Sequence, residues 1–188
     1  MSERVKIYDL ELDYEVFHRD VKYARLELKT GNLQVIMPRG YKNHQQLVEK
    51  HKKWIYKSVC QIKNTQKEAK YKTLELNRRE EEFRELVISY VKNISRDLEV
   101  NVNRVYFRRM KSRWGSCSSR KNININTLLR YLPDEMVEYI VFHEIAHLRV
   151  MKHDKKFWKI IAGRFYDYKD KEKELKVYWI AVKNLEGI

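Results

Sequence analysis

Cysteine is scarce in this chain of 188 residues, which contains only Cys60 and Cys117. Two cysteines cannot build the disulfide framework of a small secreted domain, and this favours a reducing compartment. No apolar run approaches the ~20 residues of a membrane-spanning helix, and the opening M-S-E-R-V-K is not typical of a signal peptide. We therefore expect a cytoplasmic protein with no membrane segment.

Internal repeats and low-complexity segments are also missing from the sequence. Hydrophobic residues make up 43% of the chain and charged residues 35%, which is typical of a globular protein. The length suffices for one domain with a real core. We expect a single domain over residues 1–188, acting as a monomer, with an N-terminal part (1–70) and a larger core (77–188) joined by a polar hinge.

Periodicity in hydrophobic residues predicts the order of the secondary structure elements. Expected strands cover residues 14–18, 22–28, 33–37, 102–107, 113–117 and 123–126. Expected helices cover residues 43–69, 77–97, 133–149, 154–165 and 171–184. The sequence therefore predicts an α+β fold with an N-terminal β-meander and long helices.

One predicted helix carries the sequence H-E-I-A-H, from His143 through Glu144 to His147. Residues four apart in an α-helix lie on one face, so the two imidazoles can bind one Zn²⁺ ion. Glu144 lies about 100° further round the helix, where its carboxylate can reach a water molecule held by the metal. His153 is the nearest candidate for a third ligand, which leaves a fourth position open as in catalytic zinc sites.

The predicted metal helix is nearly all apolar between Met136 and Leu148, which indicates that the candidate ligands are buried. The alternative is a structural helix whose histidines are satisfied within the core. Two buried imidazoles and a carboxylate without a metal would need other partners or lose their charge. We therefore favour a metal site that holds one Zn²⁺ ion per chain.

The charge of the chain is strongly positive, at +14 from 40 basic and 26 acidic residues. Such an excess favours anionic partners. Residues 104–130 contain eight basic residues and no acidic one. This region is either a solvated basic surface or a nucleic-acid interface. The residues that we expect at such an interface are Arg108, Arg109, Lys111, Arg120 and Lys121.

The short alternating strand before the metal helix is a candidate for substrate binding. It consists of Ile123, Asn124, Ile125 and Asn126. As an exposed edge, it would offer unpaired N–H and C=O groups to an extended peptide and present the scissile bond to the metal. The alternative is an ordinary internal strand. Arg113 is a further candidate for contact with the substrate.

Several segments together resemble the YgjP-like metallopeptidase family. They are R-W-G-S-C at 113–117, I-N at 125–126, H-E-I-A-H-L at 143–148, and His153 followed by Phe157–Trp158. The resemblance covers nearly the whole chain, because the family also opens with a strand meander and a helix containing Trp-Ile, here Trp54–Ile55. Metzincins share the spacing of the histidines but need a glycine where this chain has Val150, so we reject that assignment.

The resemblance implies a zincin-like core over residues 77–188. In this core His143, His147 and His153 would be the zinc ligands and Glu144 the catalytic acid/base of an endopeptidase. The chain is also similar to SprT-like and WLM proteases, some of which cleave proteins crosslinked to DNA, so DNA is an expected partner beside a peptide substrate. Two alternatives stay open: a nucleic-acid-binding module with a structural or inactive metal site, and a zinc hydrolase of small amides.

Overall fold

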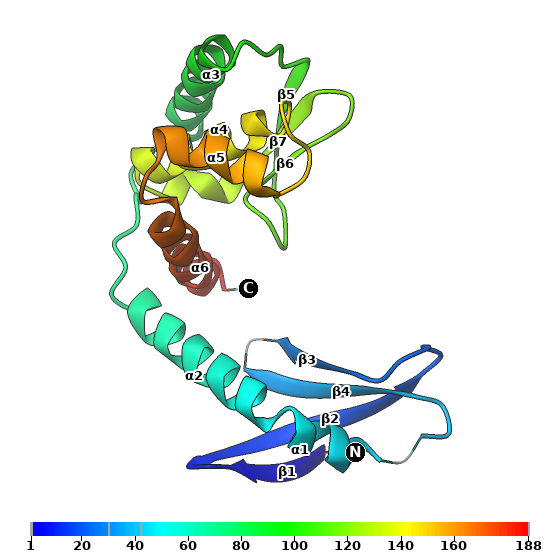
Figure 1. The fold of residues 1–188 in the computed structure, drawn as a ribbon. Coiled ribbons are helices and arrows are strands. Elements are labelled where there is room, and N and C mark those ends of the chain that lie inside the picture. Colours follow the sequence, from blue (N-terminus) through cyan, green and yellow to red (C-terminus); the bar gives the residue numbers. More distant parts are fainter. Residues whose placement is uncertain (1, 30, 42, 188) are drawn as a thin grey trace. The chain divides into compact units, whose positions relative to one another are not determined.

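The computed structural model describes residues 2–29, 31–41 and 43–187. They form an α+β fold with two small sheets, which confirms the predicted fold class. The chain divides into two compact units, Met1–Glu68 and Ala69–Ile188 (Figure 1). Over the described residues, no helix is both long enough and apolar enough to cross a membrane.

The first unit contains a four-stranded sheet. Its strands are β1 (Ser2–Ile7), β2 (Leu10–Arg19), β3 (Arg25–Lys29) and β4 (Asn32–Pro38). Two antiparallel hairpins, β1-β2 and β3-β4, meet through a parallel pairing of β2 with β4. The strands are therefore not joined in the simple order of the predicted meander. The buried side chains of Val35, Ile36 and Met37 cover both faces of β4, as is typical of a central strand.

Two helices, α1 (His44–Lys50) and α2 (Lys52–Ala69), follow the sheet. Their residues Val48, Ile55 and Val59 are buried in one core with side chains of the strands. The sequence predicted one continuous helix over residues 43–69. The structure interrupts it at His51, where the backbone leaves the helical region (φ −107°, ψ 12°).

The second unit combines helices with a three-stranded sheet. Its elements are α3 (Glu80–Asp97), β5 (Arg104–Arg108), β6 (Gly115–Cys117), β7 (Asn122–Asn126), the 3₁₀ helix η1 (Thr127–Tyr131), α4 (Asp134–Ala146), α5 (Lys155–Arg164) and α6 (Tyr168–Leu185). In the sheet, β7 pairs in parallel with β5 and antiparallel with β6. β7 is therefore the central strand, and β6 is an edge strand.

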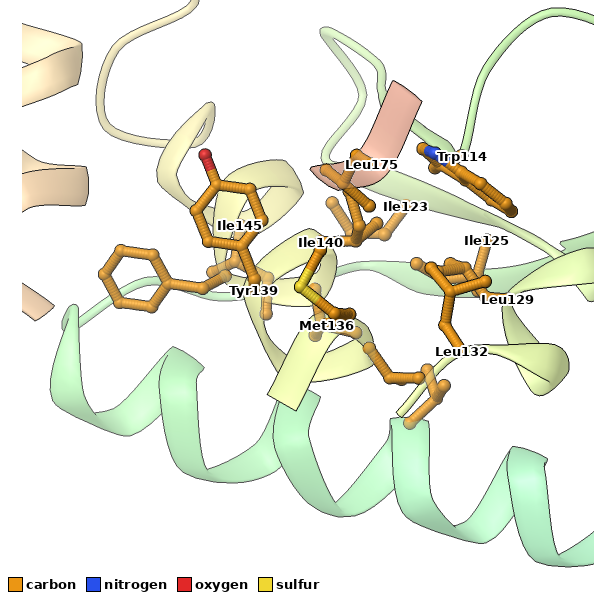
Figure 2. Packing of buried hydrophobic residues seen from close by; sticks show 14 of the residues in the cluster. Trp114, Ile123, Ile125, Leu129, Leu132, Met136, Tyr139, Ile140, Ile145 and Leu175 are labelled. Atoms are coloured by element: carbon orange, nitrogen blue, oxygen red, sulfur yellow. The ribbon is translucent and has the colours of Figure 1, made fainter. Parts of the chain in front are cut away.

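The core of the second unit is built around α4. Buried residues such as Met136, Tyr139, Ile140 and Ile145 lie on all sides of this helix, and a helix that is apolar all round belongs in a protein interior. Figure 2 shows side chains of β7, η1, α4 and α6 in this core. Burying one such large side chain contributes about 1.5–3 kcal/mol to stability. The histidines on α4 therefore have a rigid support.

A buried asparagine, Asn126, fixes the segment that leads into β6. Its side-chain amide donates hydrogen bonds to the carbonyls of Met110 (2.9 Å) and Arg113 (2.8 Å). Its side-chain oxygen accepts from the N–H groups of Met110 (3.2 Å) and Leu128 (3.1 Å). One side chain thus ties residues 110–113 to the start of η1.

Candidate metal centre

The three histidines of the predicted site come from two adjacent segments. His143 lies in the last turn of α4, and His147 follows as the residue that caps its C-terminus, still with helical backbone angles. The predicted helix therefore ends earlier than residue 149, although its geometry extends far enough to place both imidazoles on one face. His153 lies in the exposed loop between α4 and α5.

The three imidazoles converge on one point. One ring nitrogen from each of His143, His147 and His153 lies within 4.8 Å of the other two. The Nε2 atoms of His143 and His153 are 2.9 Å apart. Two nitrogens bound to one zinc ion at 2.0–2.1 Å in tetrahedral geometry lie ~3.4 Å apart, so a small separation of the rings is enough to admit the ion. The donor set fits a divalent cation such as zinc.

Each ring of the cluster packs against an aromatic side chain of α5. Phe157 stacks on the His147 ring, with centroids 4.5 Å apart and planes inclined by 23°. Trp158 lies beside His153, with centroids 5.7 Å apart. These two residues belong to the F-W pair that follows His153 in the sequence. Their contacts explain why bulky aromatic residues at that spacing accompany the histidines.

The imidazole of His147 is oriented by the main chain. Its Nδ1 atom lies 3.2 Å from the carbonyl oxygen of Val150. A carbonyl oxygen only accepts hydrogen bonds, so Nδ1 carries the proton and Nε2 keeps the lone pair that a metal needs. Such partners of the non-ligating nitrogen commonly fix the tautomer of histidine ligands.

His143 is half-buried, whereas His147 is buried. Burial lowers its pKa to about 3, with smaller contributions from His147 and His153, so the ring is neutral near neutral pH. Its Nδ1 atom is buried and has no hydrogen-bond partner among the described residues. Oε1 of Glu172 on α6 lies 3.8 Å from this atom.

Glu144 is a buried carboxyl group beside the histidines. Burial raises its pKa to about 8, and the positive charge of Arg113 opposes this shift. Its side chain lies against the backbone of Gly115 on β6, where an added Cβ would be 2.6 Å from the Glu144 Cγ atom. The glycine of the R-W-G-S-C segment is thus required by the space that the carboxylate occupies.

A cavity of about 790 Å³ opens next to Glu144 and the three histidines. One part of its lining comes from residues 112–117, which include β6. Another part comes from α6, through Glu172, Leu175, Lys176, Trp179 and Ile180. The cavity therefore places apolar side chains of α6 in the same lining as the histidine cluster.

The edge strand beside this cavity is not the one predicted. Ile123, Ile125 and Asn126 are fully buried, and their strand β7 is paired on both sides. The prediction of an exposed edge at residues 123–126 is therefore wrong, because long-range pairing places β7 between β5 and β6. The edge that reaches the cavity is β6, with Ser116 and Cys117 in the lining.

The other predicted substrate residues are divided between the cavity and the core. The half-buried Asn124 donates to the hydroxyl of Ser116 at 3.2 Å and does not line the cavity. Arg113 is exposed at the cavity rim and close enough to influence Glu144. Asn126 is occupied by its four structural hydrogen bonds, so Arg113 alone of these five keeps a position near the cluster.

The predicted nucleic-acid residues lie on exposed parts of the second unit, outside the cavity lining. Arg108 lies over the ring of Tyr106, 4.9 Å from its centroid. Arg109 pairs with Glu186 at 2.7 Å, whereas Lys111, Arg120 and Lys121 are exposed. Their role in binding nucleic acid stays a prediction.

Sequence reasoning missed Glu172, Trp179 and Ile180 as residues of the cavity. They belong to α6, which was predicted only as a terminal helix. Tyr139 was also missed; its hydroxyl donates to Oε1 of Glu172 at 2.6 Å. Helical periodicity marks the apolar members as packing residues, but nothing local to Glu172 indicates that it lies beside His143.

Comparison with known proteins gives a family and two similar structures. A family model described as YgjP-like, metallopeptidase domain, matches residues 75–178. The chain is similar to the metallopeptidase zymogen jannalysin of Methanocaldococcus jannaschii, with 26% identity and a TM-score of 0.42 over 48% of this chain and 86% of that one. It is also similar to the metallopeptidase zymogen abylysin of Pyrococcus abyssi, with 24% identity and a TM-score of 0.43 over 48% and 90%. A search among curated proteins found no match.

Proposed function

The chain belongs to the YgjP-like family, whose matched domain is a metallopeptidase, and on this premise we propose that it hydrolyses peptide bonds with one zinc ion held by His143, His147 and His153. The convergence of the three imidazoles carries the proposal, because their ligand atoms lie within 4.8 Å of one another beside a cavity. When bound, zinc would supply Lewis acidity toward a peptide carbonyl and a water molecule.

Glu144 is the proposed acid/base. It lines the same cavity as the histidines and follows His143 directly in the chain. A carboxylate in this position can take a proton from the attacking water and return it to the leaving amine. The backbone of Gly115 holds this carboxylate in place, since the two are in close contact.

The substrate that suits this cavity is an extended peptide within a longer chain. β6 is an edge strand whose free backbone groups can pair with such a peptide, which selects an extended conformation. Leu175, Trp179 and Ile180 then offer apolar contacts on the other part of the lining. We therefore propose an endopeptidase that accepts unfolded or extended segments, and we place it in the cytoplasm as a monomer.

DNA is a second proposed partner. Residues 104–130 carry eight basic residues and no acidic one, and Lys111, Arg120 and Lys121 among them are exposed. Basic side chains that neutralise phosphates give an affinity that falls steeply with salt. The alternative function is a nucleic-acid-binding module whose metal site is structural or inactive. Such a module would bind DNA with the same salt-dependent affinity but would cleave no protein.

The experiment that tests the proposal is cleavage of an unstructured protein and of a DNA-crosslinked protein by the zinc-loaded chain. Each substrate is tested with and without chelator and with and without DNA. We expect cleavage that the chelator abolishes and added zinc restores. The Glu144→Gln variant should still bind zinc but should no longer cleave either substrate. Salt-sensitive DNA binding with no cleavage of either substrate would favour the alternative. Full turnover by Glu144→Gln would rule out the role of Glu144.

A further inference from the structure

The two histidines of the H-E-I-A-H segment differ in how their rings are held. His147 has the carbonyl of Val150 as a partner for Nδ1. His143 has no hydrogen-bond partner for its buried Nδ1 among the described residues, although its Nε2 faces His153 at 2.9 Å. When both of these Nε2 atoms bind a cation, neither can carry a proton. The proton of His143 must then lie on Nδ1, where it needs an acceptor.

Glu172 is placed to be that acceptor. Its Oε1 atom lies 3.8 Å from Nδ1 of His143, just beyond hydrogen-bonding distance. The same oxygen accepts the hydroxyl of Tyr139 at 2.6 Å. Tyr139 is fully buried and lies one turn before His143 on α4, so a rigid side chain holds the carboxylate beside the imidazole.

The side of the ring on which Glu172 lies excludes it from the ligand set. The three ligand nitrogens converge on one point, and His143 turns Nε2 toward it. Glu172 approaches the opposite nitrogen. A carboxylate in this position orients a ligand and increases its basicity, as outer partners of metal-bound histidines do.

We propose that Glu172, held by Tyr139, is the positioning residue of His143: it accepts the Nδ1 proton when Nε2 binds the metal. This inference rests on the proposed zinc site, and it adds α6 to the elements that build that site. It assigns a function to a carboxylate that lines the cavity and, among the described residues, lies within ion-pair distance of His143 and of no lysine or arginine.

The test measures the dissociation constant for zinc by competition with a chelator. Glu172→Ala should weaken binding about 10–100-fold, the usual loss when an outer partner of a ligand is removed. Tyr139→Phe keeps the buried ring and should cause a smaller loss. Glu172→Gln keeps an acceptor oxygen and should recover part of the affinity. The matched control is Asp170→Asn, which removes one charge from an exposed position of α6 and should leave the affinity within about twofold of the wild type.

A second readout separates positioning from a general effect on folding. In the zinc-loaded protein, NMR of ¹⁵N-labelled histidine should show the Hδ1 proton of His143 shifted downfield and protected from exchange. Glu172→Ala should lose this signal while the corresponding signal of His147 stays, because Val150 is unchanged. Melting curves of the metal-free variants check that they fold, and Tyr139→Phe and Glu172→Gln carry the test if Glu172→Ala does not.

The outcomes distinguish this inference from the proposed function. Zinc affinities of all Glu172 and Tyr139 variants within twofold of the wild type, with an unmoved Hδ1 signal, would overturn the role of Glu172 and leave the peptidase intact. A wild-type chain that binds no zinc would overturn both.

Discussion

Gly115 and Glu144 are in direct contact, because a Cβ atom at position 115 would lie 2.6 Å from Cγ and 2.7 Å from Oε1 of the glutamate. This contact joins the edge strand beside the cavity to the buried carboxylate. It gives a physical reason for the glycine in R-W-G-S-C: a side chain there would displace the proposed acid/base.

Gly115→Ala should therefore reduce peptidase activity strongly while leaving the zinc ligands in place. Overpacking of a tight contact costs typically about 1–3 kcal/mol of stability, and the displaced carboxylate would no longer reach the reacting water. Peptide cleavage, zinc content and thermal unfolding check this. The control is Gly163→Ala on α5, where an added Cβ meets nothing within 4 Å, so neither activity nor zinc content should change. Equal activity of the two variants would contradict the role of the contact.

Removal of the metal should make the stability of the protein depend on pH in a defined way. Burial raises the pKa of Glu144 to about 8 from 4.5, so the folded state keeps a proton that the unfolded state has released. Stability is then lost as the pH rises between these values. The pKa of His143 is lowered to about 3 from 6.5. This residue therefore makes the protein less stable as the pH falls, and its effect on stability is confined to pH values below 6.5.

Between pH 6.5 and 8, Glu144 contributes to the pH dependence of the unfolding free energy and His143 does not. We expect the metal-free protein to lose about 2 kcal/mol of unfolding free energy across this window, measured by urea denaturation at a series of pH values. Glu144→Gln has no proton to lose and should show a flatter profile. If unfolding free energy changed with pH equally in the wild type and in Glu144→Gln, Glu144 would not titrate between pH 6.5 and 8.

Asn126→Ala should destabilise the second unit by about 2–4 kcal/mol. The substitution removes four hydrogen bonds of a fully buried side chain and leaves their main-chain partners unsatisfied. It should also lower activity, because Arg113 and the start of β6 lose their anchor. Asn124→Ala removes a half-buried side chain bonded to Ser116 and should cost less than about 1 kcal/mol. If Asn126→Ala and Asn124→Ala lost similar amounts of stability, the buried hydrogen bonds of Asn126 would not have the importance that we assign to them.

His153→Ala should weaken zinc binding more than any substitution of Glu172, because it removes a proposed ligand, whereas Glu172 is the proposed partner of a ligand. The expected loss thus exceeds the 10–100-fold that is typical of an outer partner, as measured by metal analysis and chelator competition. His18→Ala, in the first unit, should have no effect. Unchanged zinc content in His153→Ala would place the third ligand elsewhere.

The sequence was most informative where the site is local. His143 and His147 are four positions apart on a helix that is apolar all round, so both their shared face and their burial could be read from periodicity. The spacing could not place His153 in three dimensions, yet its position ten residues after His143 kept it within reach.

Strand order was less accessible because it depends on pairings between distant segments. Alternation identified residues 123–126 as a strand, but whether that strand is central or an edge is decided by the positions of β5 and β6. The burial of Asn126 also indicates a central strand, but this burial can be inferred only once its hydrogen-bond partners at residues 110–113 are known. Glu172 lies 33 residues after Tyr139, and only the packing of α6 against α4 brings the two together.

The hydrogen bond between His147 and Val150 uses a main-chain carbonyl, which no exchange of side chain can delete. A scan of alanine substitutions would therefore score position 150 by the loss of a half-buried valine and pass over the contact that orients the imidazole. Sequences that diverge widely in this turn can still preserve the ring's direction, provided that the backbone keeps its path. Detecting the contact requires an altered peptide bond, such as an ester at the carbonyl of residue 150, instead of an altered codon.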